Sequence, residues 1–189
     1  MAYQTRHPAI HPTVIAWISI GSNLDLPVAQ VRHALGALAA VPESTLLWQS
    51  RLYQTAPVGG VTQPAFINAV ARLQTALQPR TLLSHLQALE AAAGRHRADE
   101  IYWGPRVLDL DLLSYGTTHS TDPELTLPHP RLHERAFVLI PLAEFDPELI
   151  IPGCGRIADH LPAVTGQLIT RISDDTQEMS ACNACSAQA

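Results

Sequence analysis

The order in which strand-like and helix-like hydrophobic patterns follow one another constrains the fold of this chain most. Strand patterns are β-branched or alternating apolar runs, whereas helix patterns repeat apolar residues every three or four positions. The order is strand, helix, strand, strand, helix, strand, which predicts an α+β, ferredoxin-like βαββαβ core. In this arrangement an antiparallel sheet carries both helices on one face and leaves the other face for a site or further elements. The predicted strands are 13–20, 44–55, 66–76 and 107–115, and the predicted helices are 26–41 and 79–94.

A further helical pattern covers residues 135–145. We predict one domain over 1–172, with 1–12 as an N-terminal extension, because a chain of 189 residues suits a single hydrophobic core. The polar, small residues of 173–189 predict a disordered tail.

Composition excludes several classes of protein. The formal net charge is −5, whereas a protein that binds duplex nucleic acid usually has a strong basic excess. The first residues lack the features of a signal peptide, and charges interrupt the longest apolar stretches, so we predict no membrane span. The three cysteines, two of them Cys182 and Cys185 in the polar tail, are too few for a disulfide framework and indicate a reducing, cytoplasmic compartment.

An acidic pair on the last core strand carries the clearest chemistry. Asp109 and Asp111 are two residues apart, so on a strand both carboxylates point to one face while the leucines around them point to the core. Two adjacent anions repel each other and need a counter-charge. Mg²⁺ suits them, because it usually binds one or two carboxylates together with substrate phosphates, and two carboxylates can also bridge a pair of ions. Taken alone, such a pair is more typical of a solvated strand edge than of a metal site.

Positive residues precede this pair. Arg95, His96 and Arg97 lie in the loop before the strand, and Arg106 lies directly ahead of it. Guanidinium groups match phosphate oxygens, so together with the carboxylates they favour polyphosphate chemistry over a merely solubilising loop. Trp103, in the same loop, can stack on a flat ring or simply pack. The sequence contains neither a P-loop nor a dinucleotide-binding glycine motif.

Other candidates have both a functional and a structural interpretation. His129, between two prolines, can donate to phosphate or lie in a surface turn. Phe66 and Asn68 share one face of the third strand, where they contact a heterocycle or satisfy the core and the local backbone. Gln87 and Glu90 lie three apart on the second helix, and their pattern alone predicts exposure to solvent.

These residues resemble a known family. The run Gly-Pro-Arg-Val-Leu-Asp-Leu-Asp-Leu-Leu at 104–113 looks like the signature of 6-hydroxymethyl-7,8-dihydropterin pyrophosphokinase, an enzyme of folate biosynthesis. Further segments stand in that family's order and at its spacing, so the resemblance covers roughly residues 14–161. They are 20–24, 53–57, 66–68, 90–95 and 127–129.

The resemblance implies a magnesium-dependent diphosphotransferase that moves pyrophosphate from ATP to 6-hydroxymethyl-7,8-dihydropterin and releases AMP. ATP is then a co-substrate, two Mg²⁺ ions bind Asp109 and Asp111, and the loops 56–64 and 95–106 close over the substrates. Asp109 is one candidate to accept the hydroxyl proton. The enzyme is expected to be a monomer. The implied catalytic residues are Arg95, Arg106, Asp109 and Asp111. The implied ATP-binding residues are Gln87, Glu90, Arg97, Trp103, Arg106, Leu112, Thr126, His129 and Arg135. The implied pterin-binding residues are Thr55, Pro57, Val58, Phe66, Asn68, Trp103 and Phe137.

Two other functions compete with this one. A non-catalytic regulatory module is possible because a fold alone does not determine a function, but such a module has no need of the acidic pair and its arginines. A nucleotidyltransferase with the same acidic pair would release pyrophosphate rather than AMP. Three positions depart from the family pattern: Ala98 stands where some members carry lysine, Glu124 where an arginine can contact ATP, and Pro130 where an aromatic residue can occur.

Overall fold

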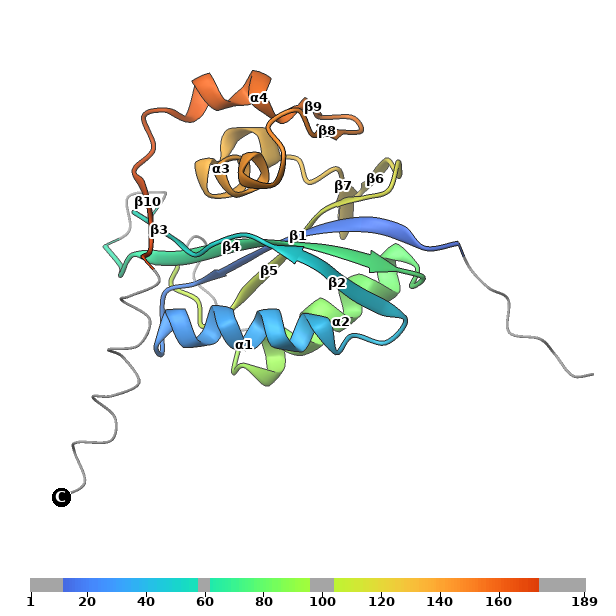
Figure 1. Ribbon diagram of the computed structural model, residues 1–189. Helices are drawn as coiled ribbons and strands as arrows, with labels where there is room; N and C mark the ends of the chain where they lie inside the picture. The colour runs from blue at the N-terminus through green and yellow to red at the C-terminus, as the bar shows by residue number, and fades with distance from the viewer. Residues whose placement is uncertain (1–11, 58–61, 96–103, 174–189) are drawn as a thin grey trace, which may run out of the picture.

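A computed structural model describes residues 12–57, 62–95 and 104–173 and shows one main sheet between two helical layers (Figure 1). Helices α1 and α2 cover one face of the sheet, and α3 and α4 lie over the other face. The strands are β1 (Val14–Ser22), β2 (Ser44–Gln49), β3 (Tyr53–Thr55), β4 (Phe66–Thr75), β5 (Asp109–Tyr115), β6 (Ser120–Asp122), β7 (Leu125–Leu127), β8 (Ile150–Ile151), β9 (Gly155–Arg156) and β10 (Ile169–Arg171). The helices are α1 (Pro27–Ala39), α2 (Pro79–Ala92), α3 (Ala136–Phe145) and α4 (Ile157–His160), with 3-10 turns at Leu132–Glu134 and Leu161–Val164.

The sheet confirms the predicted core. Its strand order is β10-β3-β4-β1-β5, and β2 also pairs with β4. Every pairing in it is antiparallel, including those of β1 with β4 and with β5. Helices α1 and α2 lie together beneath it, as the split βαβ arrangement requires (Figure 1). The first strand of the chain is therefore central, with both of its edges paired.

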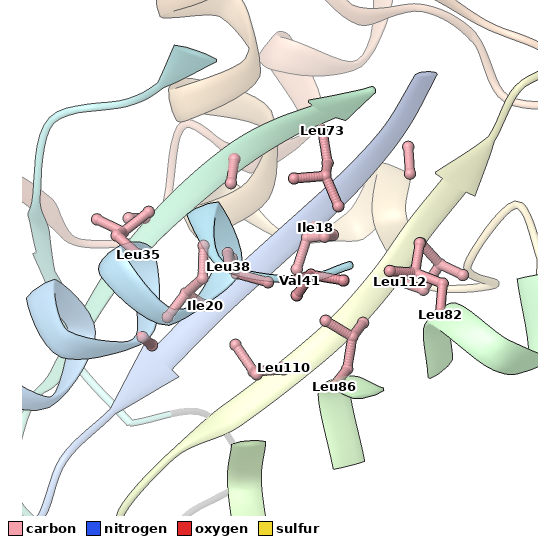
Figure 2. Close-up of a cluster of buried hydrophobic side chains, with 14 of the residues drawn as sticks. Ile18, Ile20, Leu35, Leu38, Val41, Leu73, Leu82, Leu86, Leu110 and Leu112 are labelled. Atoms are coloured by element: carbon pink, nitrogen blue, oxygen red, sulfur yellow. The ribbon is translucent and has the colours of Figure 1, made fainter. Parts of the chain in front are cut away.

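Strand alternation places the main core between the sheet and helices α1 and α2. Ile18 and Ile20 of β1 point to this side, as do Leu110 and Leu112 of β5. They meet the apolar stripes of the two helices, which include Leu38 and Leu86 (Figure 2). Leu73 and its alternate neighbours on β4 complete the layer, as their spacing predicts. Each of these seven labelled side chains is at most 5% exposed.

The opposite face of the sheet changes character along its length. Trp17, Val70 and Leu113 form a second apolar cluster with Leu139 and the rest of the buried side of α3. Further along the same strands, polar residues such as Ser19, Asn68 and Asp111 take the place of the apolar ones. Side chains two residues apart share a face, so one set of strands supplies both the floor of a core and the floor of a site.

The predicted strand 44–55 is broken into β2 and β3. At the break, Ser50 donates its backbone N–H to the carbonyl oxygen of Val70, and Ser50 Oγ accepts a hydrogen bond from Val70 N (2.8 and 2.9 Å). A serine side chain thus replaces a backbone acceptor, which ends the regular ladder without leaving a buried amide unpaired.

Several short elements were not predicted from the pattern. The hairpins β6–β7 and β8–β9 and the edge strand β10 have two or three residues per strand. Helix α3 agrees with the prediction and continues through Pro141. The N-terminal extension and the tail beyond residue 173 lie almost entirely outside the described residues. Across the described ranges, no helix is both long and apolar enough to span a membrane.

Candidate functional site

A pocket of about 570 Å³ opens at the polar end of the sheet, next to the first turn of α3. Strands β1, β4 and β5 form its floor, and the segment 129–137 forms one wall. Many of the predicted site residues line it: Thr55, Phe66, Asn68, Arg106, Asp109, Asp111, His129, Arg135 and Phe137. Residues separated by more than eighty positions in the sequence thus meet in one cavity.

Gly21 of β1 forms the middle of the floor. Its backbone partners are Asn68 on one side and Asp109 on the other, so the three residues stand in one row across the sheet. A Cβ atom at position 21 would lie 3.2 Å from Asn68 Oδ1 and 4.0 Å from Asp109 Cβ. The absence of a side chain therefore keeps open the space between the amide and the carboxylate.

The carboxylates of Asp109 and Asp111 face this space together, as their spacing predicts, with side chains 28% and 32% exposed. Guanidinium groups provide their counter-charge. Asp109 Oδ1 accepts hydrogen bonds from Nη1 of Arg106 (2.8 Å) and of Arg95 (2.6 Å). Asp111 Oδ2 accepts one from Arg135 Nη1 (3.1 Å). The site thus combines two anions with three guanidinium groups, and two of these, Arg106 and Arg135, line the pocket where they are able to bind phosphate oxygens.

The two carboxylates have pKa values that shift in opposite directions. Burial raises the pKa of Asp109, but the charges of Arg106 and Arg95 outweigh it, so the net pKa lies below the usual range. Burial and the negative charge of Asp109 raise the pKa of Asp111, and His129 and Arg135 offset this only in part. Asp111 therefore pays an electrostatic cost for its position, whereas Asp109 does not.

Arg95 and Glu90 form a buried ion pair behind the pocket, which corrects the exposure predicted for Glu90. Their side chains are 6% and 1% exposed, and Arg95 Nη1 donates to Glu90 Oε1. Glu90 Oε1 also accepts the backbone N–H of Leu110 (2.8 Å). Arg95 bridges this helix carboxylate to Asp109 on the strand. The pair therefore links α2 to the floor of the pocket.

His129 presents one ring nitrogen toward the pocket. Its Nδ1 accepts the backbone N–H of Arg131 (3.2 Å), which makes Nε2 the protonated nitrogen of the neutral ring. Nε2 lies 3.9 Å from Asp111 Oδ2. Burial lowers the pKa of His129, although the charge of Asp111 opposes this shift. A neutral imidazole that donates from Nε2 is thus available to an oxygen atom bound in the pocket.

Two aromatic rings and an amide define the other part of the pocket. Phe66 and Phe137 line it together with Asn68 and Thr55. Asn68 is 3% exposed and its Nδ2 donates to Thr55 Oγ1 (2.9 Å). This bond leaves Asn68 Oδ1 on the side of Gly21. Aromatic faces with a fixed amide oxygen suit a flat heterocycle that carries N–H groups.

Several of the remaining predicted residues that the structure describes do not line the pocket. Leu112 is buried in the core on the helix side of the sheet. Gln87 is exposed on α2, and Thr126 Oγ1 donates to the carbonyl oxygen of Asp122 (3.0 Å). Pro57 is described but does not line the cavity. Val58, Arg97 and Trp103 lie outside the described residues, together with His96 and much of both loops.

Asn23 lies in the segment 20–24, and the sequence pattern alone predicts no role for it. It is 2% exposed, and its Oδ1 accepts the backbone N–H of Arg106 (2.7 Å). Its Nδ2 donates to Gln63 Oε1 (3.0 Å) and to the carbonyl oxygen of Pro64 (3.1 Å). One buried amide thus joins the ends of the segments 62–64 and 104–106 beside the pocket. The available signal was a polar residue directly after a buried strand.

Comparison with known proteins identifies the family of the chain. Residues 17–147 match the family model described as 7,8-dihydro-6-hydroxymethylpterin-pyrophosphokinase. The chain is 42% identical over 156 residues to a 2-amino-4-hydroxy-6-hydroxymethyldihydropteridine pyrophosphokinase of Pseudomonas aeruginosa, covering 82% of this chain and 95% of that one. It is 40% identical over 130 residues to the protein of the same name from Bacillus subtilis, covering 69% of this chain and 77% of the relative.

Solved structures agree in fold. The wild-type HPPK-DHPS of Plasmodium falciparum, crystallised with pterin and p-hydroxybenzoate, superimposes with a TM-score of 0.62 at 14% identity. The match covers 82% of this chain and 44% of that chain, so this protein corresponds to less than half of the Plasmodium protein.

Proposed function

The chain belongs to the 7,8-dihydro-6-hydroxymethylpterin-pyrophosphokinase family, and we propose that the pocket between β1, β4, β5 and α3 is where it performs that family's reaction. The reaction transfers pyrophosphate from ATP to 6-hydroxymethyl-7,8-dihydropterin and gives AMP and the pterin pyrophosphate, a step of folate biosynthesis. A cytoplasmic location and a monomeric state stay predictions from the sequence.

One observation supports this assignment most: the acidic pair, its guanidinium partners and the aromatic wall line the same cavity. Asp109 and Asp111 with Arg106 and Arg135 provide the part suited to phosphates. Phe66, Phe137 and Asn68 provide the part suited to a pterin ring, and the two parts meet at Gly21. A substrate hydroxyl and a polyphosphate chain can therefore approach each other within one pocket.

The carboxylate oxygens of the pocket suit Mg²⁺ ions whose coordination is completed by substrate phosphates. Asp109 and Asp111 offer carboxylate oxygens on one face, and the described residues contain no group of three or more His, Cys, Asp or Glu that could hold a metal ion. Mg²⁺ usually binds one or two carboxylates, and water and phosphate oxygens occupy its other coordination positions. We propose two such ions at this pair, and when bound they would neutralise charge on the phosphates.

The side chains of the chain then act by positioning and by charge. Arg106 and Arg135 already lie in hydrogen-bond contact with the carboxylates, from which their forks are able to reach bound phosphate oxygens. His129 donates from Nε2 on the same side. The lowered pKa of Asp109 makes it a weak proton acceptor, and transfers of this kind need little help from a base.

Removal of divalent cations is expected to abolish AMP formation. With ATP and 6-hydroxymethyl-7,8-dihydropterin present, excess EDTA should reduce the rate by at least about 10³-fold, because metal neutralisation of phosphate charge contributes several kcal/mol. Excess Mg²⁺ should restore the rate, while the thermal melting curve of the protein without substrates stays unchanged by EDTA. Pterin-dependent AMP formation that persists in EDTA would contradict the proposed role of the acidic pair.

A further inference from the structure

The first turn of α3 needs an acceptor from outside the helix. Ala136 is the first residue of α3, so no carbonyl of the helix accepts its backbone N–H. Ala136 is also 1% exposed, which keeps water from this amide. Arg135 precedes the helix in an extended conformation and does not cap it with its own side chain. A buried N–H without a partner would destabilise this turn.

Gln167 supplies that acceptor from the C-terminal part of the chain. Its Oε1 accepts the N–H of Ala136 (2.9 Å), and its Nε2 donates to the carbonyl oxygen of Glu134 (2.7 Å). One amide thus bonds the backbone on both sides of Arg135. Gln167 also lines the pocket itself. It lies beyond residues 17–147, which match the family model.

The turn held in this way carries two residues of the site. Arg135 donates to Asp111 Oδ2 (3.1 Å), and its guanidinium carbon lies 5.4 Å from the centre of the Phe137 ring. Both side chains line the pocket, one toward the acidic pair and the other on the aromatic wall. A shift of the backbone between residues 134 and 136 would move both of them.

Gln167 is itself anchored through the strand that follows it. Strand β10 pairs with β3, and Ile169 stands opposite Thr55, a residue of the pocket. The N–H of Ile172 donates to the carbonyl oxygen of Leu52 (2.9 Å). The segment 167–172 therefore connects the sheet edge at β3 with the first turn of α3, and Figure 1 shows β10 beside β3.

We propose that Gln167 is a positioning residue, which sets Arg135 and Phe137 for catalysis by capping α3 from a distant part of the chain. This inference rests on the proposed function of the pocket. Gln167 is an exposed residue, so its replacement leaves both hydrophobic clusters intact.

The kinetic test compares Gln167→Leu with Gln74→Leu. Gln74 donates to Thr13 Oγ1 (2.7 Å) at the other end of β4, so its variant also removes a glutamine hydrogen bond but leaves the pocket unchanged. We expect Gln167→Leu to lower kcat/KM about tenfold, the order of effect of losing the partly buried hydrogen bond to Ala136, and Gln74→Leu to keep the wild-type value. Equal kcat/KM for the two variants would overturn the proposal.

A double variant tests whether Gln167 acts through Arg135. In an Arg135→Met background, Gln167→Leu is expected to lower kcat/KM less than about threefold, because the side chain that it positions is gone. Two losses that simply multiply would show that Gln167 acts by another route and would overturn the proposal.

Amide exchange at Ala136 provides a readout that needs no turnover. Gln167→Leu should speed exchange of this amide at least about tenfold, whereas Gln167→Glu, which keeps an acceptor oxygen near the helix start, should largely preserve its protection. Unchanged exchange in Gln167→Leu would show that the cap does not hold the turn. If the wild-type protein formed no AMP while exchange responded as expected, the proposed function would fail and the structural link would stand.

Discussion

Asp111→Asn is expected to abolish AMP formation and, at the same time, to stabilise the folded protein. The activity should fall at least about 10³-fold, because the variant removes one of the two carboxylates that we assign to Mg²⁺. The melting temperature should rise by roughly 1–4 °C, because burial and the charge of Asp109 raise the pKa of Asp111 in the folded state. Asp109→Asn should be equally inactive but less stable, with a melting temperature roughly 4–8 °C lower after loss of about 2 kcal/mol.

The opposite signs follow from the two pKa shifts. A carboxyl group whose pKa is raised by folding destabilises the protein when ionised, and this cost disappears as the pH falls toward about 4. The advantage of Asp111→Asn should therefore shrink on acidification. The lowered pKa of Asp109 has the reverse consequence: its stabilising contribution is complete at neutral pH and is lost as the pH falls through its folded pKa.

Thermal unfolding at neutral and mildly acidic pH, together with AMP formation, measures the expected effects of both variants. Asp159→Asn is the matched control, because Asp159 pairs with Arg156 on the surface with a side chain 58% exposed. It should change neither property. If Asp111→Asn were as active as the wild type, or if both site variants lost stability equally, the electrostatic description of the pocket would be wrong.

Arg95→Met is expected to lower the free energy of unfolding by about 3–5 kcal/mol, the usual result of removing one partner from a buried ion pair. The substitution leaves the carboxylate of Glu90, 1% exposed, without the guanidinium that neutralises it. It also removes one of the two guanidinium groups that neutralise Asp109, so catalysis should fall together with stability. Urea unfolding at neutral pH measures the first effect independently of the second.

A double variant identifies the cause of this loss. Glu90→Gln in the Arg95→Met background removes the uncompensated charge but keeps an oxygen for the N–H of Leu110, so it should recover more than half of the lost stability. Arg80→Met is the surface control, because Arg80 forms ion pairs with Asp122 and Glu124 and its side chain is 60% exposed. We expect no measurable change there. Additive losses in the double variant would show that Arg95 stabilises the fold by packing alone.

The core could be predicted because its periodicities are long. Strands β1, β4 and β5 each have seven to ten residues, and their alternation decides which side chains face the helices. The same alternation puts Asp109 and Asp111 on one face of β5 and Leu110 and Leu112 on the other. The break at Ser50 and the strand β10 depend instead on hydrogen bonds to distant strands. Local pattern does not contain such information.

The residues of the site also fall into a group that local patterns predict and a group that they do not. Residues on predicted strands, such as Asn68 and Asp111, could be placed together from topology. Glu90 was misjudged although a signal was present, because it continues the stripe of Leu82 and Leu86 at intervals of four residues, and all three are buried. Asn23 and Gln167 act through backbone groups of segments far away in the sequence. Their roles become visible only when those segments meet.

Product analysis with the wild-type protein tests the central claim most directly. The protein is incubated with Mg²⁺, ATP and 6-hydroxymethyl-7,8-dihydropterin, and the nucleotides and phosphates are separated and quantified over time. We predict one AMP for each pterin pyrophosphate formed, and no AMP without the pterin. ADP as the product would identify an ordinary kinase, free pyrophosphate would identify a nucleotidyltransferase, and folded protein without turnover would indicate a non-catalytic module; each of these results would contradict pyrophosphoryl transfer in this pocket.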